Sequence, residues 1–174
     1  MFKQFVKLRQ KKKTTKNIWE TDYPDIWVIE DRNSFLLAVN GWLCRKCNYG
    51  DSIEKLSKAE KSFFLVFLLQ GQVGNGGFVQ FFFNSSGEFA HEVVDALNEI
   101  GAVHTLQIYK RVMEAVGGFV PKDWAERETW YEDIITDEVA DILGECDRVF
   151  YKDTDDLDEL NYKYILSNKE QFSR

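Results

Sequence analysis

Residues 57–87 read SKAEKSFFLVFLLQGQVGNGGFVQFFFNSSG, and the expected fold follows largely from this segment. Ser57 is followed three residues later by Glu60, which is the capping-box pattern of a helix N-terminus. The run after it is apolar on nearly every side, and this predicts a central helix that the rest of the domain surrounds. Glycine-rich residues 74–77 then predict a break before a short phenylalanine-rich helix over residues 78–83.

Apolar residues recur at helical spacing on both sides of this segment. Upstream, residues 25–46 follow the spacing, and Asn33-Ser34 predicts a division of this segment into two helices. Downstream, Gly101 and Gly117-Gly118 are placed to end two further helices, because glycine readily takes the left-handed conformation of a helix C-terminus.

Two more helices are expected in the second half. Asp123 and Glu126 start one that runs without a break to residue 149, and residues 153–156 start the last. The apolar faces of the four downstream helices are, in order, Phe89, Val93, Leu97 and Ile100; Val103, Leu106, Met113 and Val116; Tyr131, Ile135, Val139, Ile142, Cys146 and Val149; and Leu157, Leu160, Tyr164 and Ile165.

These patterns predict an all-α fold, a compact multi-helix domain with a central apolar helix. No convincing alternation typical of strands and no internal repeat is present. Residues 17–174 are expected to form a single helical domain. Residues 1–16 hold seven Lys or Arg residues and no acid, and are expected to form a flexible basic arm.

The charge is strongly asymmetric along the chain. The formal net charge is −7, but residues 88–160 alone hold twenty acidic and six basic residues. Such an imbalance indicates electrostatic partners rather than a particular fold. The longest apolar run, residues 63–69, is shorter than the ~20 residues that cross a bilayer, so no transmembrane segment is expected. Three cysteines are too few for a disulfide framework, which favours a cytoplasmic location.

Few residues suggest catalysis or metal binding. Cys44 and Cys47 form a lone C-x-x-C, whereas a structural zinc site needs four ligands. Cys146, His91 and His104 lack ligand spacing, and both histidines are expected at the surface, His91 with Asp95 one turn later. No catalytic residue, cofactor or metal is therefore expected, and a metal or redox protein using Cys44 and Cys47 is the least favoured alternative.

The segment NGGFVQFFFNSSG, residues 75–87, resembles the N-G-G-F-x-Q-F/Y-F-x-N-S-x-G signature of the bacterial DNA-mimic protein family. The resemblance covers about residues 55–172. It implies a helical fold, often a homodimer, and an acidic surface with which at least one relative occupies a DNA-binding partner. The signature residues are Asn75, Gly76, Gly77, Phe78, Gln80, Phe81, Phe82, Asn84 and Gly87.

The signature itself has a structural interpretation. Gly76-Gly77 permits positive φ or close backbone approach, and Asn75 can cap the helix that follows. Phe78, Phe81 and Phe82 share one helical face. Gln80 and Asn84 are four residues apart and are expected to hydrogen-bond to each other, so a structural role is favoured over ligand binding.

The acidic half is the candidate functional region. Asp133, Asp137, Asp141 and Glu145 form a ladder with steps of ~6 Å along one predicted helix, flanked only by Arg127 and Arg148. The remaining candidate acids are Glu92, Asp95, Asp155, Asp156, Asp158 and Glu159. A solvated acidic face, or acids that favour a helix N-terminus, would produce the same pattern.

The sequence thus predicts a non-enzymatic interaction protein. Its partner is expected to be a basic, nucleic-acid-binding protein that the acidic surface occupies by DNA mimicry. The acidic body is not expected to bind nucleic acid directly, because carboxylates repel phosphates. The main alternative is a helical scaffold or binding protein without DNA mimicry.

Overall fold

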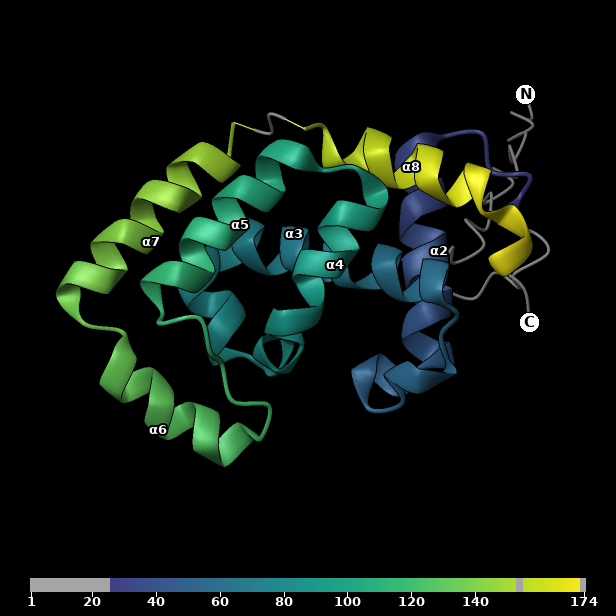
Figure 1. Cartoon of the computed structure of the whole chain (residues 1–174). Helices are drawn as coiled ribbons and strands as arrows, with labels where there is room; N and C mark the ends of the chain where they lie inside the picture. The colour runs from purple at the N-terminus through teal and green to yellow at the C-terminus, as the bar shows by residue number, and fades with distance from the viewer. Residues whose placement is uncertain (1–25, 153–154, 173–174) are drawn as a thin grey trace, which may run out of the picture.

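The computed structural model describes residues 26–152 and 155–172. Within these ranges the chain forms α-helices and no strand, which confirms the predicted all-α fold (Figure 1). The predicted basic arm, residues 1–16, lies outside the described residues. The helices are α2 (Arg32–Lys46), α3 (Lys58–Phe83), α4 (Ala90–Ile100), α5 (Val103–Ala115), α6 (Trp124–Ile134), α7 (Asp137–Phe150) and α8 (Leu157–Ser167), with short 3-10 helices η2 (Asn48–Gly50), η3 (Ile53–Lys55), η4 (Ser85–Phe89) and η5 (Lys169–Gln171).

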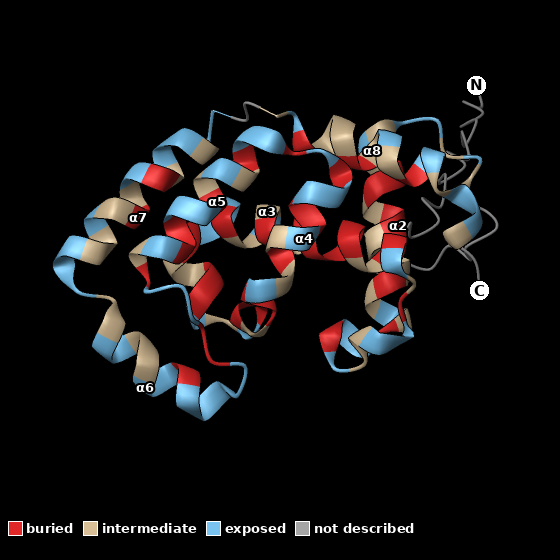
Figure 2. Ribbon diagram, in the orientation of Figure 1, coloured by how far each residue is buried: buried red, intermediate tan, exposed pale blue. Residues whose placement is uncertain are grey.

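Helix α3 is the predicted central helix. It packs against α2, α4, α6, α7 and α8, and half of its residues are buried (Figure 2). The expected capping box starts it, since the Glu60 N–H donates to Ser57 Oγ at 3.2 Å and the Ser57 N–H donates to Glu60 Oε2 at 2.7 Å. The fully buried Glu60 carboxylate also pairs with Lys46 at 2.8 Å.

The position of α3 explains its composition. Among the described residues, it is the one helix long and apolar enough to span a membrane, and half of its apolar window is buried inside the domain. The core helix of a soluble protein passes the same test. The absence of a transmembrane segment, expected from residues 63–69 alone, stays a prediction.

The predicted glycine break is confirmed, but it is narrower than expected. Only Gly76 (φ −163°, ψ 25°) and Gly77 (φ 75°, ψ −178°) leave the helical conformation. The expectation that Asn75 caps the second half of α3 was wrong. Instead, Asp147 of α7 accepts a hydrogen bond from the Phe78 N–H at 2.8 Å, and the Tyr151 hydroxyl donates to the Val73 carbonyl at 2.9 Å. Helix α7 therefore caps α3 on both sides of the break.

Two predicted helix boundaries were wrong for local reasons. The polar pair Asn33-Ser34 lies inside the first turn of α2, because Asp31 is the N-cap and accepts the Ser34 N–H at 2.8 Å. The helix predicted from residue 123 to residue 149 is divided into α6 and α7. Thr136 is the N-cap of α7 and accepts the Val139 N–H at 3.3 Å.

The apolar faces are mostly as predicted. The face of α4 is buried, and Gly101 ends this helix with a φ of 80°. Val149, predicted to lie on a buried stripe, is 39% exposed, and Val103 on the apolar face of α5 is 57% exposed. Helix α8 begins at Leu157 with Asp156 as its N-cap, and residues 153–154 lie outside the described part of the chain.

Candidate protein-binding surface

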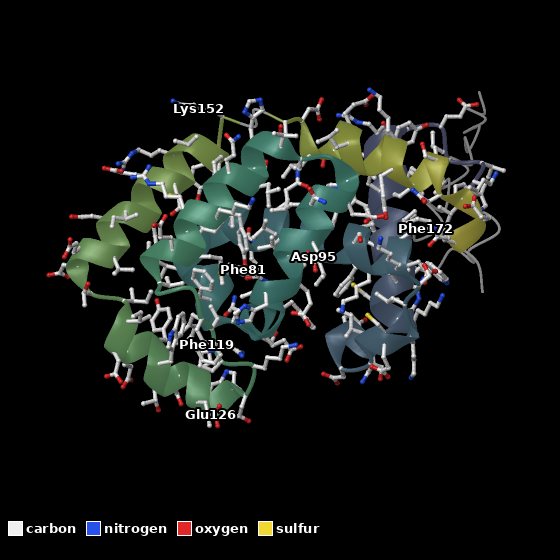
Figure 3. All side chains as sticks on the ribbon, in the orientation of Figure 1. Phe81, Asp95, Phe119, Glu126, Lys152 and Phe172 are labelled. Carbon is white, nitrogen blue, oxygen red and sulfur yellow. The ribbon has the colours of Figure 1, made fainter. Side chains whose placement is uncertain are left out.

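The phenylalanines of residues 78–83 join α3 to the helices of the second half. Phe78, Phe81 and Phe82 are fully buried, which confirms their shared face (Phe81 is labelled in Figure 3). The ring of Phe78 lies 5.6 Å from that of Phe150 in α7, and the ring of Phe82 lies 5.9 Å from that of Trp130 in α6. The signature thus fixes the positions of α6 and α7.

The signature amides bridge the break in α3. Gln80 Nε2 and Asn84 Nδ2 both donate to Gln72 Oε1, at 3.1 Å and 2.7 Å. The predicted hydrogen bond between Gln80 and Asn84 was wrong, because Gln72 from the other side of the break provides a shared acceptor. The structural interpretation of these amides is supported, since they tie the two halves of α3 together.

Replacing Gln72 with methionine is expected to lower the free energy of unfolding by about 1–2 kcal/mol. The substitution keeps the length of the side chain, but it leaves the half-buried Asn84 amide without its acceptor and leaves Gln80 Nε2 only the long contact to the Gln72 backbone carbonyl at 3.5 Å. Gln72→Glu is the matched control, because its carboxylate can still accept both donors. Chemical denaturation of the three proteins measures the difference. If methionine and glutamate variants are equally stable, the bridge does not stabilise the break.

The end of the signature encloses Arg127 of α6. Arg127 is only 2% exposed and donates to the backbone carbonyls of Pro121, Lys122 and Asn84 at 3.1, 2.8 and 3.4 Å. A Cβ on Gly87 would lie 2.9 Å from Arg127 Cδ and 2.5 Å from the Phe82 carbonyl oxygen, so glycine is required there. Burial lowers the pKa of Arg127 from its ordinary value. Arg127, expected to flank the acidic ladder, is therefore buried and bound to backbone carbonyls rather than to the carboxylates of the ladder.

Helices α6 and α7 carry a dense group of exposed carboxylates. We call it the α6–α7 acidic surface, and it consists of Glu126, Glu128, Glu132, Asp133, Asp137, Glu138, Asp141 and Glu145. These helices form the edge of the domain opposite α2 and α8 (Figure 1), and Glu126 lies at the outer end of α6 (Figure 3). Among described residues, only Glu145 of this group has an ion-pair partner, Arg111 at 2.6 Å.

The predicted ladder of four carboxylates is interrupted. Asp133 belongs to α6, whereas Asp137, Asp141 and Glu145 belong to α7, so the unbroken four-residue spacing does not exist. The two helices are nevertheless consecutive, with only residues 135 and 136 between them. The structure therefore brings four of the predicted acids to one edge, on two helices rather than one.

The other predicted acids have structural partners or stand apart. Asp155 accepts the N–H groups of His104 and Thr105 at the start of α5, and Asp156 caps α8. Asp158 accepts from Gln70 at 2.9 Å. Glu92 forms a salt bridge with Lys122 at 2.7 Å. Glu159 forms salt bridges with Arg32 at 2.9 Å and with Lys163 at 3.1 Å.

Glu159 and Asp95 differ in their surroundings. The hydrogen bond from Arg32 is the main cause that lowers the pKa of Glu159. Asp95 is exposed on α4, away from α6 and α7 (Figure 3).

Two exposed aromatic side chains beside α6 were missed from the sequence. Phe119 and Trp124 are 61% and 55% exposed. Trp124 is the first residue of α6, and Phe119 lies in the loop before it. This loop is held in place by Val120, which is buried and whose carbonyl oxygen and backbone nitrogen lie 3.2 Å and 3.3 Å from His91 Nε2. His91 is at the surface, as predicted, but contacts this loop rather than Asp95. The only signal in the sequence was two aromatics just after Gly117-Gly118.

The cysteines offer little support for a metal or redox site. Cys47 and Cys146 are buried, Cys44 is half-buried, and all three are free thiols. Burial raises the pKa of each thiol, which disfavours the reactive thiolate. In the described part of the chain, no group of three or more His, Cys, Asp or Glu side chains could hold a metal ion.

Comparison with known proteins gives one match. The model of the family described as DMP19-like protein matches residues 54–168, a span that contains α3 to α8. No curated protein and no solved structure matches the chain. The matched span includes the signature, the buried Arg127 and the whole α6–α7 acidic surface. Since it covers well over half of the sequence, the chain belongs to the DMP19-like family, a family of DNA-mimic proteins.

Proposed function

We propose that this protein is a non-enzymatic DNA mimic whose α6–α7 acidic surface occupies a basic, nucleic-acid-binding protein. The observation that carries the proposal is the group of eight exposed carboxylates at one edge of the domain. The one basic residue between Asp123 and Glu145, Arg127, is buried, and among the described residues Glu145 alone of the eight has an ion-pair partner, Arg111. Membership of the DMP19-like family supports the same function. A cytoplasmic location belongs to this proposal.

The spacing of the carboxylates means that more than one acidic helix is needed to imitate DNA. Asp137, Asp141 and Glu145 lie on one helix at steps of ~6 Å. Duplex DNA carries one charge per ~1.7 Å of its axis, so a single helix imitates too few phosphates. Helix α6 adds a second row of carboxylates, and a homodimer would double the array. The same negative charge keeps the acidic body from binding nucleic acid directly.

Capture of a partner tests the proposal. The triple variant Asp133→Asn, Asp137→Asn and Asp141→Asn is expected to lose most of the basic protein that the wild type captures from native lysate at low salt. All three side chains are exposed and have no ion pair with another described residue, so the variant should fold normally. Its thermal stability is expected to stay close to that of the wild type, because relief of the repulsion within α7, about 0.2–0.5 kcal/mol per pair, is offset by the loss of the Asp137 charge from the helix N-terminus.

The matched control removes the same charge from the other side of the domain. Glu30→Gln, Glu54→Gln and Glu170→Gln are exposed changes near α2 and α8, and this control is expected to keep full capture. Equal loss in both triple variants would mean that net charge, not the α6–α7 acidic surface, determines binding.

A second candidate function is partner recognition without DNA mimicry. It is favoured by the exposure of Phe119 and Trp124, since a buried aromatic anchor often dominates a protein interface. In that case Trp124→Ala would weaken partner binding more than the triple Asp→Asn variant does. DNA mimicry predicts the opposite order and a steep loss of binding as salt rises.

A further inference from the structure

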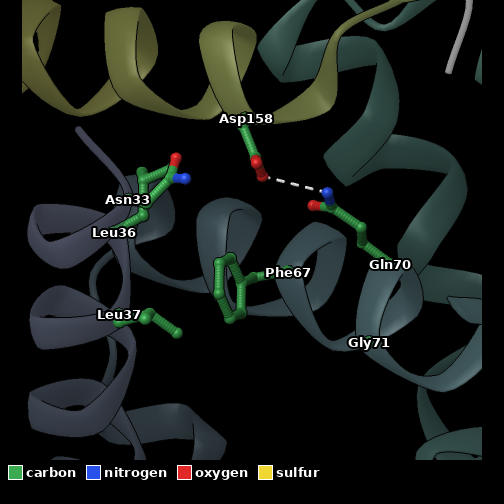
Figure 4. A pocket seen from close by; sticks show the side chains of 7 residues that line it. All are labelled: Asn33, Leu36, Leu37, Phe67, Gln70, Gly71 and Asp158. Carbon is green, nitrogen blue, oxygen red and sulfur yellow. Dashed lines mark hydrogen bonds between the residues drawn. The ribbon is translucent and has the colours of Figure 1, made fainter. Parts of the chain in front are cut away.

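A cavity lies between α2, α3 and α8, at the opposite end of the domain from the α6–α7 acidic surface. Its volume is about 330 Å³, within the range of small-molecule sites. Its apolar lining comes from Leu36 and Leu37 of α2 and Phe67 of α3, and Gly71 leaves space on the α3 side (Figure 4).

Three polar side chains from three helices converge above the Phe67 ring (Figure 4). Gln70 Nε2 donates to Asp158 Oδ1 at 2.9 Å, and this bond fixes the orientation of the Gln70 amide. The Gln70 oxygen points toward the space above Phe67, is buried, and has no hydrogen-bond partner among the described residues. Asn33 contributes a third polar group from α2.

The unpartnered oxygen calls for a donor inside the cavity. A buried acceptor without a hydrogen bond costs about 1–3 kcal/mol, so an occupant that donates a hydrogen bond there is favoured. Asp158 is the one charged side chain that lines the cavity, and its carboxylate also accepts. The neighbouring cation Arg32 is paired with Glu159 at 2.9 Å and Asp156 at 3.6 Å; it interacts electrostatically with Asp158 but forms no ion pair with it within 4 Å.

We propose that this cavity binds a primary ammonium group on a short alkyl stem. The ammonium donates to Asp158 and to the Gln70 oxygen after a small shift of the Gln70 side chain that keeps its hydrogen bond to Asp158, and it lies near the face of Phe67, where a cation is attracted to the ring. The stem packs against Leu36, Leu37 and Phe67. The group can come from a free alkylamine or from a lysine side chain of another protein.

An NMR titration of the full chain with 1,4-diaminobutane tests the site, with 1,4-butanediol as the neutral probe of the same length. Saturable shifts are expected for the Gly71 backbone amide and the Gln70 and Asn33 side-chain amides with the diamine, and none with the diol. Nα-acetyl-lysine methylamide distinguishes the sources. If it binds as well as the diamine, the source is a protein side chain; if only the diamine binds, the source is a free amine.

Two variants locate the binding. Gly71→Leu fills the cavity, and because a Cβ there meets no atom within 4 Å, the helix can accept the side chain. It is expected to abolish the shifts. Asp158→Asn keeps an acceptor for Gln70 but removes the charge, and is expected to weaken binding by about tenfold. Asp51→Asn, an exposed aspartate outside the cavity, is the control and should change nothing.

The proposal is overturned if the diol shifts the same resonances as the diamine. It is also overturned if Gly71→Leu and Asp158→Asn both bind the diamine as the wild type does, or if the shifts occur only in α6 and α7. None of these results tests whether the α6–α7 acidic surface occupies a basic protein, so the two proposals stand or fall separately.

Discussion

Replacing Gly77 with alanine is expected to lower the free energy of unfolding by at least about 3 kcal/mol. With φ of 75° and ψ of −178°, Gly77 lies in a region of backbone conformation that is almost exclusive to glycine. A Cβ at this position would also overlap the carboxylate of Asp147, the group that accepts the Phe78 N–H. The substitution therefore strains the backbone and removes the cap of the second half of α3.

Gly74→Ala is the matched control, three residues upstream in the same helix. Gly74 is helical and exposed, and a Cβ there meets no atom within 4 Å. This variant is expected to be more stable than the wild type by roughly 0.5–1 kcal/mol, because alanine has the higher helix propensity. Thermal and urea denaturation of both variants tests whether stability falls for Gly77→Ala and rises for Gly74→Ala. Equal stability of the two would show that α3 does not need its break.

Replacing Arg127 with methionine is expected to cost about 3 kcal/mol or more. The guanidinium donates to three backbone carbonyls, and its removal leaves them without these donors inside the protein. For a chain of this size, this corresponds to a fall in melting temperature of roughly 6–12 °C. Partner binding should fall as well, because Arg127 joins α6 to the end of the signature.

The control for this change is Arg148→Met on α7. Arg148 is exposed, and the same substitution there is expected to change stability by no more than about 0.5 kcal/mol. Calorimetry of the two variants gives the comparison. A melting temperature for Arg127→Met within 2 °C of the Arg148→Met value, roughly the shift of a 0.5–1 kcal/mol change, would contradict a structural role for the buried guanidinium.

Local chemistry explains which parts of the fold could be predicted. The start of α3 depends on Ser57 and Glu60, which are three residues apart, so their capping box is visible in the sequence. The division between α6 and α7 was missed because Ile135 and Val139 keep the four-residue apolar spacing across it. Thr136, a good N-cap residue followed by two acids, was the signal that indicated a new helix.

The contacts that hold the acidic helices could not be predicted. Arg127 binds backbone carbonyls, which have no sequence signature, and so it could not be distinguished from an exposed base beside acidic residues. Likewise, Gln72 meets Gln80 and Asn84 only because of the angle at Gly76-Gly77. In the same way, sequence spacing could not show that Asp155 contacts the start of α5 and Asp158 contacts Gln70, and that neither belongs to the α6–α7 acidic surface.

Competition with duplex DNA tests the central claim most directly. The basic protein captured at low salt is first bound to a fluorescent DNA duplex. The DMP19-like protein is then added, and the fluorescence anisotropy of the duplex is followed. DNA mimicry predicts that the wild type displaces the duplex completely, and that the Asp133→Asn, Asp137→Asn and Asp141→Asn variant does not. If the partner instead binds DNA and the wild-type protein at the same time, the α6–α7 acidic surface does not imitate DNA.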